Sequence, residues 1–111
     1  MPRYRMVVMS SPVEGREAEY NDWYQNVHLS EVVALGGIKS AQRFRLARNM
    51  GESKGAPYLA VYDIETDDID AVLQEIESKA LGGQLNMSTA VDTQTAFAAV
   101  YEEFGSVVSR S

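Results

Sequence analysis

The order of strand-like and helix-like segments is the feature that most constrains how this chain folds. Four segments rich in β-branched and aromatic residues are predicted to be strands, over residues 4–9, 38–47, 58–64 and 97–104. Residues 16–29 repeat large apolar side chains at helical spacing, and residues 67–80 do the same after Asp67 or Asp68 as the cap. The predicted order is strand, helix, strand, strand, helix, strand.

Polar residues and glycines indicate where the two predicted helices begin and end. Ser11 is a candidate N-terminal cap for the first helix, although Gly15 favours a start a few residues later. Ser30 is a candidate cap for a short extra turn through Val33. Glycine pairs at 36–37 and 82–83 are predicted to end the helices.

This order predicts one α+β domain over residues 1–111 with a ferredoxin-like βαββαβ fold. Two split βαβ units of this kind form a four-stranded antiparallel sheet with strand order 4-1-3-2. The first and third strands are then central, and both are apolar on two faces, while charges fall on the edge strands. Period-two alternation in the second strand separates Ile38, Ser40, Gln42, Phe44 and Leu46 from Lys39, Ala41, Arg43, Arg45 and Ala47.

A sheet of this topology carries both helices on one face and leaves the other face uncovered. In the central strands the uncovered face presents apolar side chains, which soluble monomers rarely expose as a large patch. A second copy related by a two-fold axis is the simplest cover. We therefore expect a homodimer in which two sheets pack face to face to form an α/β barrel.

Charge and cysteine content narrow the classes of partner and compartment. The net charge is -6, from 16 acidic and 10 basic residues, which disfavours binding to nucleic acid or to anionic membranes. There is no cysteine, so disulfides and thiolate metal sites are excluded. No signal-peptide core or membrane-spanning segment is recognised, and the expected location is the cytoplasm.

A family resemblance emerges from residues 19–32, which read EYNDWYQNVHLSEV. This segment resembles the first-helix signature of EthD-like proteins, members of the dimeric α/β-barrel superfamily. Their pattern is a tryptophan-tyrosine pair, then His-Leu-Pro, then a glycine before the second strand. Trp23-Tyr24, His28-Leu29 and Gly37 match it. Ser30 replaces the proline, so the helix is expected to continue past His28.

The resemblance covers most of the chain and implies the fold and the dimer more strongly than a reaction. The superfamily supports cofactor-free oxygenation, dehydration, isomerisation and cyclisation, and haem chemistry in some branches. Because one fold supports such different reactions, membership alone does not assign an activity.

His28, the only histidine, is the first candidate catalytic residue, because an imidazole can give and take a proton near neutral pH. The alternative is a packed, hydrogen-bonded histidine without a catalytic role. Tyr24 or Tyr62 is the candidate donor that polarises a substrate oxygen, and Arg43 is the candidate that stabilises negative charge. The expected role of Arg43 and Arg45 from the residues alone is to form salt bridges with the acidic surface.

Three further residues are candidates for substrate binding. Tyr20 and Trp23 can line an aromatic pocket, or they can be ordinary core between helix and sheet. Met87 lies in the polar loop over residues 82–95, which either closes over the pocket or simply connects two elements. Tyr62 and Tyr101 are candidates for the barrel interior, or they can be residues that pack on the sheet.

Missing motifs leave three hypotheses. No phosphate-binding glycine loop, second histidine or Gly-x-Ser-x-Gly elbow is present, so no metal and no cofactor is predicted. The leading hypothesis is a proton-transfer enzyme or oxygenase acting on a small apolar or aromatic molecule. The alternatives are a non-enzymatic protein that binds a hydrophobic small molecule, and a haem protein with His28 as axial ligand.

Overall fold

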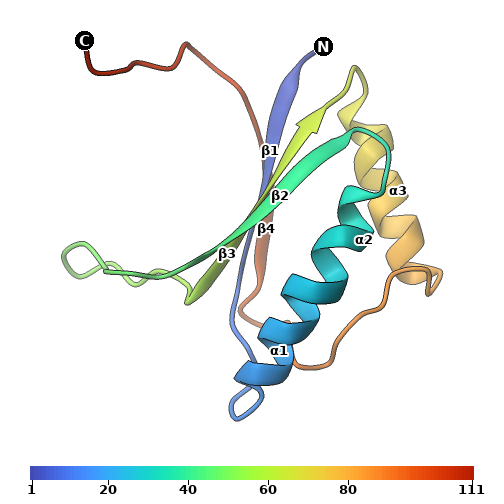
Figure 1. Cartoon of the computed structure of the whole chain (residues 1–111), viewed down its shortest axis with the longest axis vertical. Coiled ribbons are helices and arrows are strands. Elements are labelled where there is room, and N and C mark those ends of the chain that lie inside the picture. Colours follow the sequence, from blue (N-terminus) through green and yellow to red (C-terminus); the bar gives the residue numbers. More distant parts are fainter.

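The structure, a computed structural model, describes residues 1–111 and contains the predicted order of strands and helices (Figure 1). Its elements are β1 (Arg3–Ser10), α1 (Glu17–Trp23), η1 (Tyr24–His28), α2 (Leu29–Val33), β2 (Ile38–Arg45), β3 (Tyr58–Glu65), α3 (Ile69–Leu81) and β4 (Phe97–Glu102). The segments α1, η1 and α2 follow one another without a break and form one helical run. The prediction that this helix continues past His28 is therefore confirmed.

The four strands form one antiparallel sheet in the order β2-β3-β1-β4. This is the predicted ferredoxin-like order, with β3 and β1 in the centre and β2 and β4 at the edges. Figure 1 shows the helical run and α3 on the same side of the sheet. The loop between β2 and β3 and the C-terminal tail extend on the opposite side.

The core lies between the helices and the sheet face that they cover. β3 contributes Ala60, Tyr62 and Ile64, all at most 2% exposed, because alternate residues of a strand point to the same face. The helical run contributes Tyr20, Tyr24, Leu29 and Val32, and α3 contributes Val72. Burying each such side chain fully stabilises the fold by about 1.5–3 kcal/mol.

A β-bulge corrects the predicted faces of β2. The register shifts between Ile38 and Ser40, so that Ile38 pairs with Ile64 and Ser40 pairs with Asp63. Ile38 is buried on the helix side with Ala41 and Arg43, and not on the side of Ser40. The prediction for Ile38 was wrong because an extra residue at a bulge reverses the alternation.

Two predicted helix caps are also wrong. Helix α1 begins only at Glu17 and has no side-chain cap, while Pro12 forms an isolated bridge with Val91. The later start that Gly15 favoured is the one observed. Ser30 lies inside the helical run, where its hydroxyl donates to the Val27 carbonyl at 3.1 Å. The Asp68 cap is confirmed, since its carboxylate accepts from the Ala71 amide.

The outer face of the sheet has no helix over it. It presents apolar side chains from every strand: Val7, Met9, Phe44, Leu59, Val61, Phe97, Ala99 and Tyr101. Phe97 and Tyr101 are 47% and 55% exposed there. None of the helices has the length and apolar character needed to cross a membrane.

The contact between Gly37 and α3 gives the first prediction. Gly37 has φ +85°, and a Cβ added to it would lie 3.0 Å from Cγ2 of Val72. Gly15 has a similar φ of +82° with nothing within 4 Å of such a Cβ. Both G15A and G37A should lower the unfolding free energy by about 1–2 kcal/mol through the left-handed backbone.

G37A should lose about a further 1–2 kcal/mol because the added methyl overpacks the core against Val72. Urea unfolding of the two variants beside the wild type measures the difference. Equal losses would show that the contact with α3 does not constrain this turn.

Candidate active site

A π-helical turn at Tyr24–His28 organises the candidate site. The Leu29 amide donates to the Tyr24 carbonyl five residues earlier, which is the hydrogen bond of a π turn. In a regular α-helix, residues 23 and 28 would lie about 140° apart around the axis. The wider turn reduces that separation and brings His28 over Trp23. Such turns occur frequently at functional sites.

The imidazole of His28 is held between two aromatic rings. Its centroid lies 4.5 Å from that of Trp23, nearly parallel at 22°, and 5.2 Å from that of Tyr24 at 83°. Nδ1 is buried and has no hydrogen-bond partner. A protonated imidazole in this position would bury an N–H without an acceptor, which is costly. The packing therefore favours the neutral form.

The surroundings shift the pKa of His28 in the same direction. Burial lowers this pKa below its ordinary value of 6.5, while the carboxylate of Glu31 opposes the shift. At neutral pH the side chain is thus a neutral imidazole that can accept a proton.

The pKa values of the Tyr24 and Tyr62 phenols are shifted upward, in the opposite direction to that of His28. Burial raises the pKa of Tyr24 to about 12, and a hydrogen bond with the Tyr62 phenol partly offsets this. The pKa of Tyr62 is raised well above its usual range, first by burial and then by the charge of Tyr24. Both phenols remain protonated at neutral pH and can donate hydrogen bonds to an oxygen.

Arg43 completes the cluster from β2. Its guanidinium carbon lies 4.7 Å from the ring centroid of Tyr24 and 5.6 Å from that of Tyr20. These are distances at which a cation is attracted to an aromatic face. Arg43 also donates to the side-chain oxygen of Asn21 at 2.7 Å, which fixes its orientation.

The loop between α3 and β4 is fastened to the helical run beside this cluster. The indole of Trp23 donates to the Asn86 carbonyl at 2.6 Å. The backbone and side-chain amides of Asn86 both donate to the carboxylate of Glu31 at 2.9 Å. Leu85 and Ala90 of this loop are buried, so it forms a wall of the domain.

The structure brings together six of the seven residues predicted for the site. His28, Trp23 and Tyr24 form one aromatic group, and Tyr20, Tyr62 and Arg43 adjoin it through contacts with Tyr24. Met87 is not packed into this group, since it is 60% exposed. Tyr101 lies on the outer face of the sheet, opposite to Tyr62.

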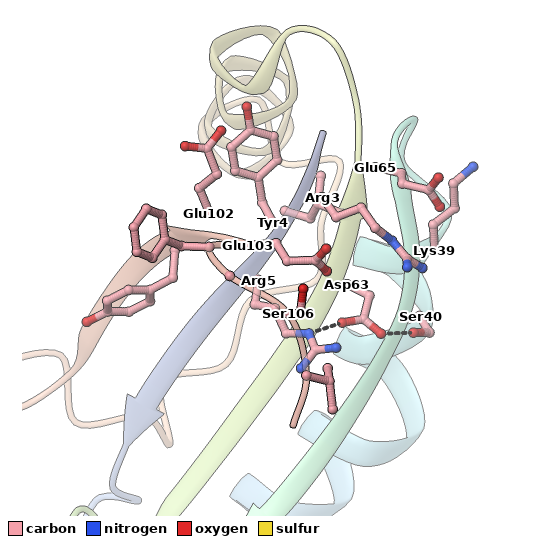
Figure 2. A pocket seen from close by; sticks show the side chains of 15 residues that line it. Arg3, Tyr4, Arg5, Lys39, Ser40, Asp63, Glu65, Glu102, Glu103 and Ser106 are labelled. Carbon is pink, nitrogen blue, oxygen red and sulfur yellow. Dashed lines mark hydrogen bonds and ion pairs between the residues drawn. The ribbon is translucent and has the colours of Figure 1, made fainter. Parts of the chain in front are cut away.

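The predicted salt bridges of Arg43 and Arg45 are absent. The ion pairs of the chain join Arg5 to Asp63 and Arg16 to Glu19. Figure 2 shows the first of these in a pocket of about 470 Å³ at the end of the sheet, where Ser40 also bonds to Asp63. A second pocket, of about 410 Å³, lies on the outer face between β1 and β2.

Neither of these outer pockets is lined by His28, Tyr24 or Tyr62. A third pocket, of about 270 Å³, reaches Arg43 from the edge of β2 but not the imidazole. Haem needs a broad open space beside its axial ligand, whereas the His28 ring is stacked on Trp23 and its Nδ1 is buried. The residues around His28 do not fit a haem.

Several residues that shape the cluster were missed in the sequence. Glu31 and Asn86 lie 55 positions apart, and no local pattern predicts their hydrogen bonds. Tyr58 was detectable, because it stands four residues before Tyr62 on the same face of β3. Its hydroxyl donates to Glu17 at 2.5 Å and accepts from Asn21 at 3.1 Å.

The order of the elements, the topology of the sheet and the position of the core place this protein in the class of small α+β proteins with a ferredoxin-like fold. More particularly, the fold is EthD-like. An ethyl tert-butyl ether D (EthD) family protein from Bacillus halodurans C-125 superposes with a TM-score of 0.61 and 22% identity, covering 94% of this chain and 100% of that one. A putative monooxygenase from Shewanella loihica PV-4 superposes with a TM-score of 0.59 and 16% sequence identity. The superposition covers 96% of this chain and 99% of that one.

Sequence comparison finds a shorter likeness. No family model matches the chain. Core atranone cluster (CAC) protein 1 of Stachybotrys chlorohalonatus (strain IBT 40285) is 43% identical over 49 residues, or 44% of this chain. The match spans 20% of that protein, well under two thirds of its length.

The environment of His28 predicts a low pKa that NMR can measure directly. As the single histidine, it gives one titrating C2-proton signal, whose midpoint should fall below 6.5 in the folded protein. E31Q should lower the midpoint further, because it removes the carboxylate that favours the charged ring. In urea the midpoint should return to about 6.5.

The lowered pKa of His28 should also make the stability of the protein depend on pH. The unfolded chain binds the proton more tightly, so the unfolding free energy rises with pH between the folded pKa and 6.5 and levels off outside that window. H28Q should lose this part of the pH dependence. A folded midpoint at or above 6.5 would contradict the packing described for the imidazole.

Proposed function

We propose that the protein is a cofactor-independent enzyme that moves a proton on a small apolar or aromatic molecule. The reaction class is that of a lyase, dehydratase, cyclase or isomerase. The observation that carries the proposal is the pairing of a neutral imidazole, whose pKa is lowered, with buried phenols whose pKa values are raised. Titratable neighbours whose pKa values are pushed apart in this way suit the roles of base and acid.

In this mechanism His28 is the base. It takes a proton from a carbon next to a carbonyl group; the electron pair of that C–H bond forms a C=C bond, and the π pair of the carbonyl moves to its oxygen, giving an enolate. The resulting imidazolium returns the proton to another atom of the same molecule or to a leaving group. Glu31, which favours the charged ring, stabilises this short-lived state.

Tyr24 and Arg43 act on the oxygen that becomes negative. The phenol of Tyr24 donates a hydrogen bond to it, and the phenol of Tyr62 lies beside Tyr24. The guanidinium of Arg43, 4.7 Å from the Tyr24 ring centroid, adds positive charge on the same side. Donors fixed before the reaction stabilise a developing oxyanion most effectively.

The comparisons support a small-molecule role without naming a reaction. The Shewanella protein is given as a putative monooxygenase, and the Stachybotrys protein is named for a core atranone cluster. A cofactor-free oxygenase would also begin by removing a proton from its substrate, so it uses the same base.

Hydrogen exchange tests the proton transfer without knowledge of the natural substrate. A set of aryl ketones such as acetophenone is incubated with the protein in D₂O, and NMR follows the loss of the α-proton signal. H28Q should slow the catalysed exchange by about 100-fold or more, because a positioned base contributes about that factor.

Asp22→Asn is the matched control, since Asp22 is exposed on the same helical run and bonds only to Asn26 there. It should exchange at the wild-type rate. Exchange in the wild type no faster than in buffer, or equally fast in H28Q and D22N, would exclude His28 as the base.

A non-enzymatic binding protein is the second candidate, and the position of the two pockets of about 470 and 410 Å³ favours it. Both border the uncovered side of the sheet, away from His28. If two copies pack by this face, as we propose, a hydrophobic molecule could be held between the sheets. Its binding would survive H28Q, and no product would form.

The proposed homodimer predicts the effect of a charge in the middle of the outer face. Val61 pairs with Val7 there, and V61E would place a carboxylate against the partner sheet. Sedimentation velocity should show a dimer for the wild type and a monomer for V61E. Gln74→Glu adds the same charge on an exposed position of α3 and should remain dimeric. A monomeric wild type at micromolar concentration would contradict the proposal.

A further inference from the structure

The pocket at the edge of β2 has features of an anion site that the proposed chemistry does not use. It has a volume of about 270 Å³ and opens between α1, η1 and β2. Its lining is mostly polar and consists of Asn21, Gln25, Arg43, Phe44, Arg45 and Tyr58. Two arginines, two amides and one phenol thus face one small volume, with a single phenylalanine at the rim.

The two arginines are not neutralised. Arg43 and Arg45 take no part in either ion pair of the chain, although acidic residues outnumber basic ones by 16 to 10. Arg45 has no hydrogen-bond partner among the protein's side-chain bonds, whereas Arg48 bonds to the carbonyl of Ala47. Unpaired positive charge on an acidic protein is an electrostatic feature that attracts a small anion.

The surrounding hydrogen bonds hold the pocket's donors in place. Asn21 accepts from Arg43 and donates to Tyr58, whose hydroxyl donates to the carboxylate of Glu17. Arg43 donates two hydrogen bonds to Asn21, at 2.7 and 3.5 Å, and a guanidinium has five N–H groups in all. A guanidinium oriented in advance binds a carboxylate with less loss of side-chain freedom.

We propose that this pocket binds the carboxylate group of a small, planar organic acid. Arg45 and the other N–H groups of Arg43 would hold the two oxygens, in the forked geometry that arginine offers to carboxylates. The rings of Phe44 and Tyr58 would contact the apolar body. A volume of about 270 Å³ lies below the range typical of drug-sized ligands, which suits a compact acid.

Arg43 belongs to both this pocket and the aromatic cluster, with its guanidinium 4.7 Å from the Tyr24 ring. An acid anchored at Arg45 would therefore lie next to the proposed catalytic group. The claim that the bound acid is a substrate rests on the proposed function, but the claim that the pocket binds it does not.

Benzoate is the probe, and its neutral amide benzamide is the control ligand. Titration into ¹⁵N-labelled protein should give saturable shifts of the side-chain amides of Asn21 and Gln25. Arg45→Gln should weaken the affinity at least about tenfold, a loss of about 1.4 kcal/mol. Arg48→Gln removes the same charge from an exposed loop position nearby and should bind like the wild type.

Phosphate should bind more weakly than benzoate, because it cannot contact the two rings. The inference is overturned if benzoate does not saturate by about 20 mM, if benzamide binds equally well, or if Arg48→Gln weakens binding as much as Arg45→Gln. Arg45→Lys, which keeps the charge and the fold but loses the fork, should fall between the wild type and Arg45→Gln.

Benzoate binding also separates this inference from the proposed function. H28Q should leave the affinity unchanged because His28 does not line the pocket. Loss of ketone exchange with intact benzoate binding supports both proposals, whereas absent benzoate binding overturns this one alone.

Discussion

The structure depends on one contact, the packing of the aromatic side of the helical run against the covered face of the sheet. Tyr20 is fully buried there, and its hydroxyl shares a 2.5 Å hydrogen bond with the buried hydroxyl of Ser10 on β1. That bond fixes the height of the helix above the sheet, since neither hydroxyl has water to replace its partner. With Tyr20 fixed, Tyr24 one turn later meets Tyr62, and the π turn that follows sets the position of His28.

The same packing shifts the pKa values of the imidazole and of the phenols in opposite directions. Burial disfavours charge on either group, so it lowers the pKa of the imidazole and raises those of the phenols. The neutral base and the neutral acids follow from one cause and need no additional charged residue. The guanidinium of Arg43 lies within 5.6 Å of the centroids of three tyrosine rings and donates to the side chain of Asn21.

Most of the fold could be predicted from repeating patterns in the sequence. The features that depart from those patterns could not be predicted. A run that is apolar on both faces predicted residues 58–64 as a central strand, and helical spacing predicted that Tyr20 and Tyr24 share a helix face. The bulge after Ile38 and the π turn at His28 each insert one residue into a regular repeat, so no periodic pattern reveals them. The contacts of Asn86 with Trp23 and Glu31 depend on where a long loop crosses the helix, which only the folded chain determines.

The two faces of the sheet differ in their side chains, and this difference decides whether the proposed assembly and the proposed binding can coexist. The outer face carries apolar side chains such as Val7 and Val61 and would suit a second copy, whereas Tyr20, Tyr24 and Tyr62 belong to the core on the helix side. The arginine pocket opens at the edge of β2 towards α1, and of its lining residues only Phe44 belongs to the outer face. Packing two sheets together would therefore leave Arg43 and Arg45 accessible while Phe44 becomes shared between rim and interface. The affinity of the pocket for a carboxylate would then depend on dimerisation through the ring of Phe44.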